Sequence, residues 1–374
     1  MVSVRQHSGL KVMIEAIAGH ALAGQRQDRG LLVPEETWPS LLRELYAERL
    51  TGLAVEAVES GRVDLSDTQW AELIDRQRTA MLWALALEKK LFRLAPAFER
   101  AGVDLVVLKG PSLAHTVYPD PSWRPFGDLD LLVRTKDWRR ACEILEEHGF
   151  HRRLPEPRPG FDERFGKAAV HRDEQGIDID LHRTLVLGPF GLWIEPEVLF
   201  DRAVPLSLGG RAFRRLDDTS LLLHVCMHAV LGFEKALIMP LRDVMQVAQQ
   251  GDVDWQELHT LARKWKLRAV VHRAFLMAAT TLSTEWKPPA LEVGNETASR
   301  RELKALSAYV TERRGRGGTA RATLLAIPGV RPKLAYVLSL VAPRREFLAA
   351  RTGGRGSYVR RWRVAASWLR RRRS

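Results

Sequence analysis

Two neighbouring stretches, Leu-Lys-Gly-Pro-Ser at residues 108–112 and Arg-Pro-Phe-Gly-Asp-Leu-Asp-Leu-Leu-Val at residues 124–133, decide which fold the sequence supports. In the second stretch, Asp128 and Asp130 flank one leucine at the start of an apolar run that is typical of a buried strand. Side chains alternate between the two faces of a strand, so both carboxylates are expected on the same side. Two carboxylates this close repel each other unless a hard cation such as Mg²⁺ lies between them. The pair therefore predicts a metal site at one end of a strand.

The first stretch predicts a turn that binds phosphates. The largely apolar residues 103–108 indicate a strand, and the apolar residues after Ser112 indicate a helix. A strand that turns through a glycine into a helix N-terminus presents free backbone N–H groups and the positive end of the helix dipole. We expect Gly110 and the adjacent backbone, as far as Ser112, to cradle the phosphates of a nucleoside triphosphate (NTP). Lys109 or Arg124 is expected to neutralise the charge of these phosphates.

A predicted hairpin adds further ionisable side chains. Residues 168–171 and 177–182 are separated by a polar turn, and the second segment alternates between apolar and polar residues. Its apolar residues face the core, so Asp178, Asp180 and His182 share the opposite face. For His182, three interpretations stay open: it orients a carboxylate, it contacts a substrate, or it is an ordinary strand histidine.

Together these motifs resemble the uncharacterised nucleotidyltransferase family, which is part of the polymerase-β-like nucleotidyltransferase superfamily. The elements that carry the resemblance are Leu-Lys-Gly at 108–110, Arg-Pro-x-Gly-Asp-x-Asp-Leu-Leu-Val at 124–133 and Ile-Asp-Leu-His at 179–182. The resemblance covers roughly residues 40–290. Eighteen positions separate Gly110 from Asp128, which is similar to the spacing in abortive-infection and toxin-type nucleotidyltransferases.

The resemblance implies an Mg²⁺-dependent enzyme that transfers a nucleoside monophosphate from an NTP to an acceptor and releases pyrophosphate. Asp128 and Asp130 would hold two Mg²⁺ ions that stabilise the attacking and leaving oxygens of an in-line displacement. Asp180 matches the Asp-Leu-His element, so it is the first choice for a third metal ligand near the acceptor hydroxyl, and Asp178 is the second. The acceptor stays open among a small molecule, a sugar, a peptide, a protein side chain and an RNA end.

Two other classes of function also remain open on the sequence. One is a non-catalytic nucleotide-binding or membrane-recruited scaffold that retains the fold. The other is a phosphotransferase that moves the γ-phosphoryl group with the same metal site. The released product distinguishes the two reactions, because attack at the α-phosphorus yields pyrophosphate and attack at the γ-phosphorus yields a nucleoside diphosphate.

The order of motifs predicts an α+β fold, in which a small mixed nucleotidyltransferase-type sheet has flanking helices. Helical N-terminal and C-terminal regions are expected beside this core. The expected divisions are a helical N-terminal region at 1–100, the catalytic core at 101–205, a helical region packed on the core at 206–300, and a linker with a basic amphipathic tail at 301–374. Within the last division, residues 313–318 are expected to form a flexible linker.

Two histidines, His224 and His228, lie four residues apart in the predicted helical region, a spacing that binds zinc in some proteins. No third ligand lies nearby in the sequence, so a core or interhelical position is the preferred interpretation. His228 and Asp243 resemble recurring positions of the family, and the resemblance implies an interhelical contact between them beside the nucleotide site.

Composition indicates a globular chain with a basic tail. The chain has 374 residues, is 45% hydrophobic and 28% charged, and contains two cysteines, which implies no disulfide framework and favours a reducing cytoplasm. No apolar run approaches the ~18–20 residues of a membrane span, and charged residues interrupt the N-terminal apolar segment, which argues against a secretory signal. Residues 344–374 contain eleven arginines and one glutamate, and so carry most of the net charge of +13.

In the tail, tryptophan and aliphatic residues alternate with arginine between residues 358 and 373. This pattern slightly favours an interfacial helix on an anionic membrane surface, while the same composition suits a nucleic-acid backbone. A disordered, solubilising tail is comparably consistent with it. The expected location is therefore the cytoplasm, with peripheral association at the inner face of the membrane as one alternative.

Overall fold

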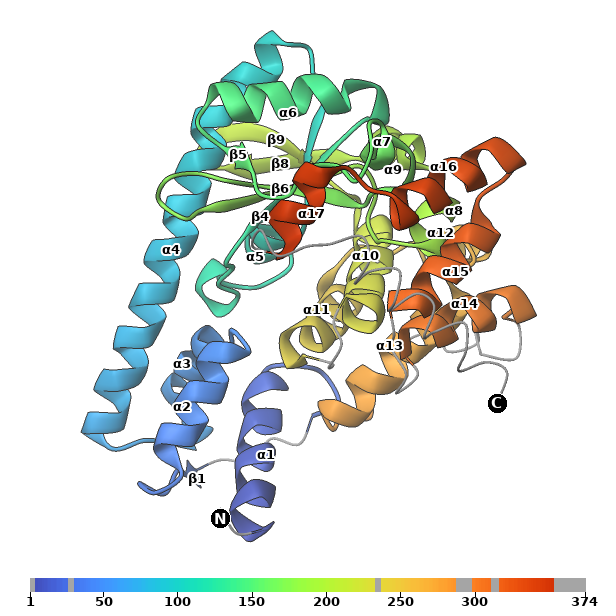
Figure 1. Ribbon diagram of the computed structural model, residues 1–374. Helices are drawn as coiled ribbons and strands as arrows, with labels where there is room; N and C mark the ends of the chain where they lie inside the picture. Colours follow the sequence, from blue (N-terminus) through green and yellow to red (C-terminus); the bar gives the residue numbers. More distant parts are fainter. Residues whose placement is uncertain (1–3, 26–29, 233–236, 287–297, 311–315, 353–374) are drawn as a thin grey trace.

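A seven-stranded mixed β-sheet organises the computed structural model (Figure 1). The structure describes residues 4–25, 30–232, 237–286, 298–310 and 316–352. The strand order is β5-β6-β7-β4-β3-β9-β8. The strands are β3 (Leu105–Val107), β4 (Leu129–Val133), β5 (His151–Arg152), β6 (Ala168–Arg172), β7 (Asp178–His182), β8 (Val204–Leu208) and β9 (Arg211–Arg215). β4 pairs in parallel with β7 and antiparallel with β3, so the predicted α+β fold with a mixed sheet is confirmed.

The N-terminal part is helical, as predicted, apart from a short parallel pair of strands, β1 (Leu31–Leu32) and β2 (Val63–Asp64). Its helices are α1 (Val4–Ala18), α2 (Trp38–Ala47), α3 (Thr51–Glu59) and α4 (Asp67–Arg100). A capping box formed by Ser66 and Gln69 starts α4. This long helix runs from the N-terminal helices to the sheet (Figure 1), so it joins the two parts of the molecule.

The helices that follow connect the strands and then form a C-terminal helical region. Those within the sheet segment are α5 (Lys109–Thr116), η1 (Pro121–Trp123), η2 (Thr135–Asp137), α6 (Trp138–Glu147), α7 (Phe161–Phe165), α8 (Pro189–Trp193) and α9 (Pro196–Arg202). Those after the sheet are α10 (Asp218–Leu231), α11 (Ile238–Gln250), α12 (Trp255–Lys264), α13 (Arg268–Thr281), α14 (Arg300–Val310), α15 (Arg316–Ala326), α16 (Val330–Val341) and α17 (Arg345–Thr352).

Alternation along β4 divides the core between the two faces of the sheet. Leu129 and Leu131 are fully buried against α4 and α6 on one face, whereas Leu132 belongs to the cluster formed with α10 and α11 on the other. Figure 1 shows α6 on one side of the sheet and α10 and α11 on the opposite side. Asp130 has the parity of Leu132, so its carboxylate lies on the face that α10 covers.

Some of the expected divisions of the chain differ from the elements of the structure. The sheet continues through β8 and β9 to Arg215, so the end of the core expected at residue 205 falls inside β8. The linker expected at 313–318 overlaps the first turn of α15, which packs on α8 and α14; these contacts outweigh the weak helix propensity of its glycines. Residues 311–315 and the basic tail from 353 to 374 lie outside the described residues. Within the described part of the chain, no helix is long and apolar enough to cross a membrane.

Candidate metal and nucleotide site

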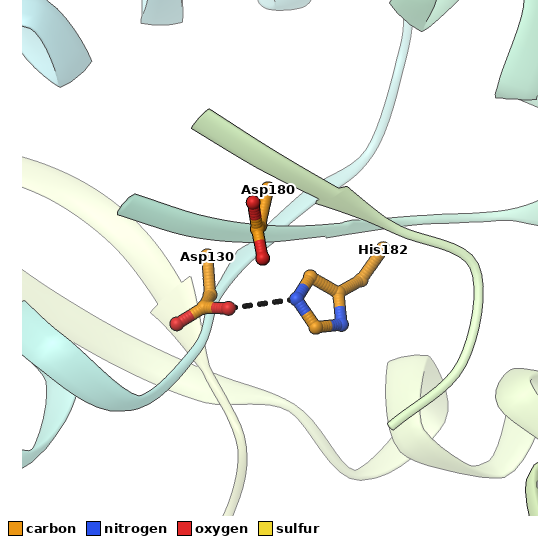
Figure 2. A group of neighbouring side chains, drawn as sticks. All are labelled: Asp130, Asp180 and His182. Atoms are coloured by element: carbon orange, nitrogen blue, oxygen red, sulfur yellow. Dashed lines mark hydrogen bonds and ion pairs between the residues drawn. The ribbon is translucent and has the colours of Figure 1, made fainter. Parts of the chain in front are cut away.

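The register of β4 and β7 brings the carboxylates of Asp130 and Asp180 together. β4 and β7 run in parallel with Asp130 opposite Asp180 and Leu132 opposite His182. In Figure 2, Asp130, Asp180 and His182 gather on one side of these neighbouring strands. Their potential ligand atoms all lie within 4.8 Å of one another, and this is the one such group of three among the described residues. Of the three carboxylates expected at the metal site, Asp130 and Asp180 therefore lie close together.

Asp130 lies in the interior of the site, with only 2% of its surface exposed. Its Oδ2 is 2.9 Å from the Lys109 ammonium and its Oδ1 is 2.7 Å from His182 Nε2. Burial alone raises the pKa of a carboxyl group, but the Lys109 charge and the His182 bond hold the pKa of Asp130 well below its usual range. Asp130 is therefore an anion at neutral pH.

His182 is fully buried and orients Asp130. Burial lowers the pKa of His182, and the nearby Lys167 charge lowers it further, so the imidazole is neutral at neutral pH. A neutral imidazole carries one N–H, and with that proton on Nε2 it donates to the Asp130 carboxylate. The structure thus favours the carboxylate-orienting interpretation of this histidine.

Asp180 has the opposite electrostatic environment. Burial raises the pKa of Asp180 to about 6, and repulsion from the Asp130 carboxylate acts in the same direction. The Lys167 ammonium opposes this rise, although burial lowers the pKa of Lys167 itself. The site therefore holds one firmly ionised carboxylate beside a second that is poorly compensated, an arrangement that favours binding of an added cation.

Lys167 is a site residue that the sequence interpretation missed. It immediately precedes β6, and its carbonyl oxygen accepts a hydrogen bond from the Arg183 N–H at 2.9 Å. The register of β6 against β7 places Ala168 opposite His182, so Lys167 enters at the same end of the hairpin. The signal for Lys167 in the sequence was a lysine just before a predicted hairpin whose second strand is acidic.

The Lys-Gly-Pro-Ser turn leads from β3 directly into α5, as expected. Lys109 has a positive φ of 26° and Gly110 departs from helical geometry, with φ 0° and ψ −99°. Lys109, Gly110 and Ser112 are all buried, and the Lys109 side chain reaches Asp130. Within the described structure, the Ser112 Oγ has no hydrogen-bond partner. The turn itself is buried, and it contributes the charged side chain of Lys109 to the site.

Asp128 lies at the outer edge of the site, just before β4. Its side chain is 39% exposed and its Oδ1 is 3.6 Å from an Arg49 guanidinium nitrogen. It does not belong to the close group of Asp130, Asp180 and His182. Its negative charge nevertheless contributes to the raised pKa of Asp180, so the two carboxylates act on the same space.

Arg124 is directed toward α11 and away from the carboxylate group. Its Nε and Nη2 donate to the two carboxylate oxygens of Asp243 at 3.0 and 2.8 Å, and the Tyr118 hydroxyl donates to Asp243 Oδ1 at 2.8 Å. All three side chains are buried. This bidentate ion pair anchors the loop that precedes Asp128 to helix α11. The contact expected between His228 and Asp243 stays a prediction.

Two further histidines face the same region from α10. Burial, followed by the Lys109 charge, lowers the pKa of His224 and of His228 well below the ordinary value, so both rings are neutral. His224 Nδ1 has no hydrogen-bond partner in the described part of the molecule. His224 is buried, which agrees with the expected core position, and His228 is partly buried.

Asp178 is held away from the other carboxylates. Arg172 donates to both of its oxygens at 2.7 and 2.6 Å, and Arg153 is 3.7 Å away. The order of preference between Asp180 and Asp178 therefore agrees with the geometry.

Comparison with known proteins identifies the family that the motifs resemble. Residues 34–283 match the family described as "Uncharacterised nucleotidyltransferase". Among solved structures, an antigenic nucleotidyltransferase-like protein from Paracoccidioides brasiliensis is similar over 56% of this chain and 94% of its own, with 14% sequence identity and a TM-score of 0.30. No curated protein matches the chain significantly in sequence. The matched segment begins before α2 and ends after α13, so it contains the whole site described above.

Proposed function

The chain belongs to the family of uncharacterised nucleotidyltransferases, and from this premise we propose that it transfers a nucleoside monophosphate from an NTP to an acceptor hydroxyl. The reaction is Mg²⁺-dependent: the hydroxyl oxygen attacks the α-phosphorus, the bond to the β-phosphate oxygen breaks, and pyrophosphate leaves. Two Mg²⁺ ions, when bound, stabilise the attacking and leaving oxygens.

The observation that carries this proposal is the register of Asp130 against Asp180, with His182 two residues farther along the same face. Carboxylate oxygens are the ligands that Mg²⁺ prefers, and burial, followed by repulsion from Asp130, raises the pKa of Asp180. A neutral imidazole that donates to Asp130 acts as the supporting partner of a metal ligand. The donor set therefore fits a divalent cation.

Each remaining residue has a role that its position supports. Asp128 completes the set of carboxylates at the exposed edge of the site. Asp180 either accepts the proton of the acceptor hydroxyl or would hold the cation that lowers the pKa of that hydroxyl. Lys109, which pairs with Asp130 in this structure, would neutralise the charge of the NTP phosphates. Gly110 and Ser112 shape the turn that presents Lys109. We assign Arg124 an indirect role, because its pair with Asp243 fixes the loop before Asp128.

Calorimetric titration of the four ribonucleoside triphosphates, with and without Mg²⁺, tests the donor site. We expect Mg²⁺-dependent binding in the wild type and its loss in Asp130→Asn. Asp178→Asn is the matched control, because this carboxylate lies on the same strand face but is paired with Arg172. Absence of NTP binding to the folded wild type would refute the donor site. Release of a nucleoside diphosphate in place of pyrophosphate would assign the protein as a phosphotransferase.

We further propose that the protein acts in the cytoplasm and that its basic tail recruits it to an anionic membrane surface or to a nucleic acid. The composition of residues 353–374 is the support, and these residues lie outside the described part of the structure. Co-sedimentation of the full chain with phosphatidylserine vesicles, and separately with RNA, distinguishes the two surfaces. Binding equal to that of a variant with its tail arginines replaced by serine would exclude both.

A further inference from the structure

A cavity of about 760 Å³ opens beside Asp128. Its walls come from three parts of the chain: the end of α2 with the start of α3, the middle of α4, and the loop before β4. The lining residues are Tyr46, Ala47, Arg49, Thr51, Thr79, Ala80, Leu82, Trp83, Pro125, Phe126 and Gly127. A cavity of this size is within the range of small-molecule binding sites.

Large apolar side chains gather at this cavity although they are open to solvent. Tyr46 is 47% exposed, Leu82 61% and Trp83 39%. Tyr46 is the penultimate residue of α2, and Leu82 and Trp83 lie in the middle of α4. Apolar surface of this kind, grouped in a hollow, is typical of a ligand-binding site.

Most polar groups around the cavity already have partners within the protein. Trp83 Nε1 donates to the Gly127 carbonyl at 3.1 Å, Thr51 Oγ1 donates to Gln77 at 2.6 Å, and Thr79 Oγ1 donates to the Asp75 carbonyl at 3.0 Å. A cavity whose donors are engaged in this way is poorly suited to read the hydrogen-bonding edge of a nucleobase. It suits an apolar or aromatic body.

Arg49 is the cation in this lining. It follows the C-terminus of α2 with a φ of 59°, the left-handed conformation in which many helices end. A Cβ at Gly127 would lie 2.8 Å from the Arg49 guanidinium, so the glycine leaves room for it. Its present partner, Asp128, is a half-exposed carboxylate at 3.6 Å, and solvent screening makes such a pair weak. Arg49 is therefore available for another anion when Asp128 binds a cation.

Phe126 separates this cavity from the phosphate-binding turn. A Cβ at Gly110 would lie 3.2 Å from the Phe126 ring, so the ring packs directly on the Lys109–Gly110 turn. The same residue lines the cavity. Asp128 follows two residues later, between the side that we assign to the NTP phosphates and the side of the cavity.

We propose that this cavity is the acceptor subsite, and that the acceptor is a small molecule or peptide side chain with an apolar or aromatic body and an anionic oxygen group that pairs with Arg49. The acceptor role of this ligand rests on the proposed function. The binding of such a ligand to the cavity is independent of that function and is tested without nucleotide.

The probes are 4-phenylbutyrate, 4-phenylbutyl phosphate and, as the uncharged counterpart, 4-phenyl-1-butanol, titrated against the protein by ligand-observed NMR and tryptophan fluorescence. We expect the wild type to bind at least one anionic probe about fivefold more tightly than the alcohol. The ratio of the two anions identifies the preferred group. In Arg49→Gln this advantage should disappear, with the affinity for the alcohol unchanged.

A pair of variants on α4 tests whether the probes occupy the cavity. Leu82→Asp places a negative charge in the lining and should weaken the anionic probes about tenfold or more. Leu85→Asp is the matched control, since Leu85 is 55% exposed on the same helix but does not line the cavity. Thermal unfolding of each variant verifies the fold. Equal probe affinity in the wild type and Leu82→Asp, or no probe binding to the wild type, would overturn the proposal.

Competition with nucleotide distinguishes an acceptor subsite from a nucleobase pocket. If the cavity binds the acceptor, Mg²⁺ and a non-hydrolysable NTP should leave probe binding intact or strengthen it, and Leu82→Asp should leave NTP affinity unchanged. Displacement of the probe by the nucleotide, together with weakened NTP binding in Leu82→Asp, would assign the cavity to the nucleobase and overturn the inference. A wild type that binds the probes but no NTP would instead count against the nucleotidyltransferase proposal, and so against the acceptor role.

Discussion

Replacing Asp180 with asparagine should stabilise the metal-free protein and abolish its response to Mg²⁺. The pKa of Asp180 is raised from 3.8 to about 6, a shift of about two pH units, and each unit corresponds to about 1.4 kcal/mol. A raised carboxyl pKa means that folding disfavours the ionised form. The free energy of unfolding therefore falls as pH rises from about 4 to about 6, and stays lower above that range. At pH 7.5 this shift lowers the free energy of unfolding by at most about 3 kcal/mol, and with solvent screening we expect a loss of about 1–3 kcal/mol.

The assay is urea unfolding of the wild type and Asp180→Asn in EDTA at pH 7.5 and pH 4.5. Asparagine does not ionise, so the variant should be about 1–3 kcal/mol more stable at pH 7.5, and the difference should shrink to about a third at pH 4.5. Added Mg²⁺ should raise the stability of the wild type alone, because a ligand stabilises the state that binds it.

Asp178→Asn serves as the control for this pair of experiments. Its carboxylate is paired with Arg172 and Arg153, so its loss should destabilise the fold slightly and leave the response to Mg²⁺ intact. The reasoning would be refuted if Asp180→Asn were less stable than the wild type at pH 7.5, or if Mg²⁺ stabilised it as strongly as the wild type.

Three further experiments test other parts of the site. Asp243→Asn leaves the buried Arg124 guanidinium without its anion, and urea unfolding should show a loss of about 3–5 kcal/mol; a loss below 1 kcal/mol would contradict the role given to this pair. His182→Leu removes the donor that orients Asp130 and should weaken Mg²⁺ binding about 10- to 100-fold in calorimetry. An unchanged Mg²⁺ affinity would identify the histidine as an ordinary strand residue. The Mg²⁺ affinity of the wild type should fall about tenfold per pH unit below pH 6, because Asp180 must release its proton, so a constant affinity between pH 5 and 7 would count against this assignment.

Local periodicity was sufficient to predict the strands that carry the site. The alternation in residues 128–133 and 177–182 predicted the strands that carry Asp130 and Asp180, and the parallel pairing of β4 with β7 places these two residues opposite each other. The polar turn at residues 173–176 correctly predicted the β6–β7 hairpin. These predictions succeeded because strand periodicity and turn chemistry depend on residues close in sequence.

The orientation of the remaining charged groups depends on contacts between distant segments. Arg124 and Asp243 are 119 residues apart, and nothing in either neighbourhood indicates that they form a buried pair. Asp128 turns toward Arg49 at the end of α2, a helix that the sequence pattern assigned to a separate region. Lys167 differs, because it belongs to the same predicted hairpin as Asp180; it was missed because their proximity follows from the strand register and not from a motif.

The charges around β4 and β7 explain why the sheet tolerates two adjacent carboxylates without a cation. Lys109 pairs with Asp130 and keeps this carboxylate ionised, the form that the proposed metal site requires. Asp180 has no ion pair of comparable geometry among the described residues, and its raised pKa means that it takes up a proton only as the pH falls to about 6. A bound cation would reduce the repulsion between the two carboxylates above this pH and would compete with the proton below it. The buried, ionised Asp180 that weakens the metal-free protein is also a proposed cation ligand, so the gain in stability of Asp180→Asn and its loss of Mg²⁺ affinity should occur together.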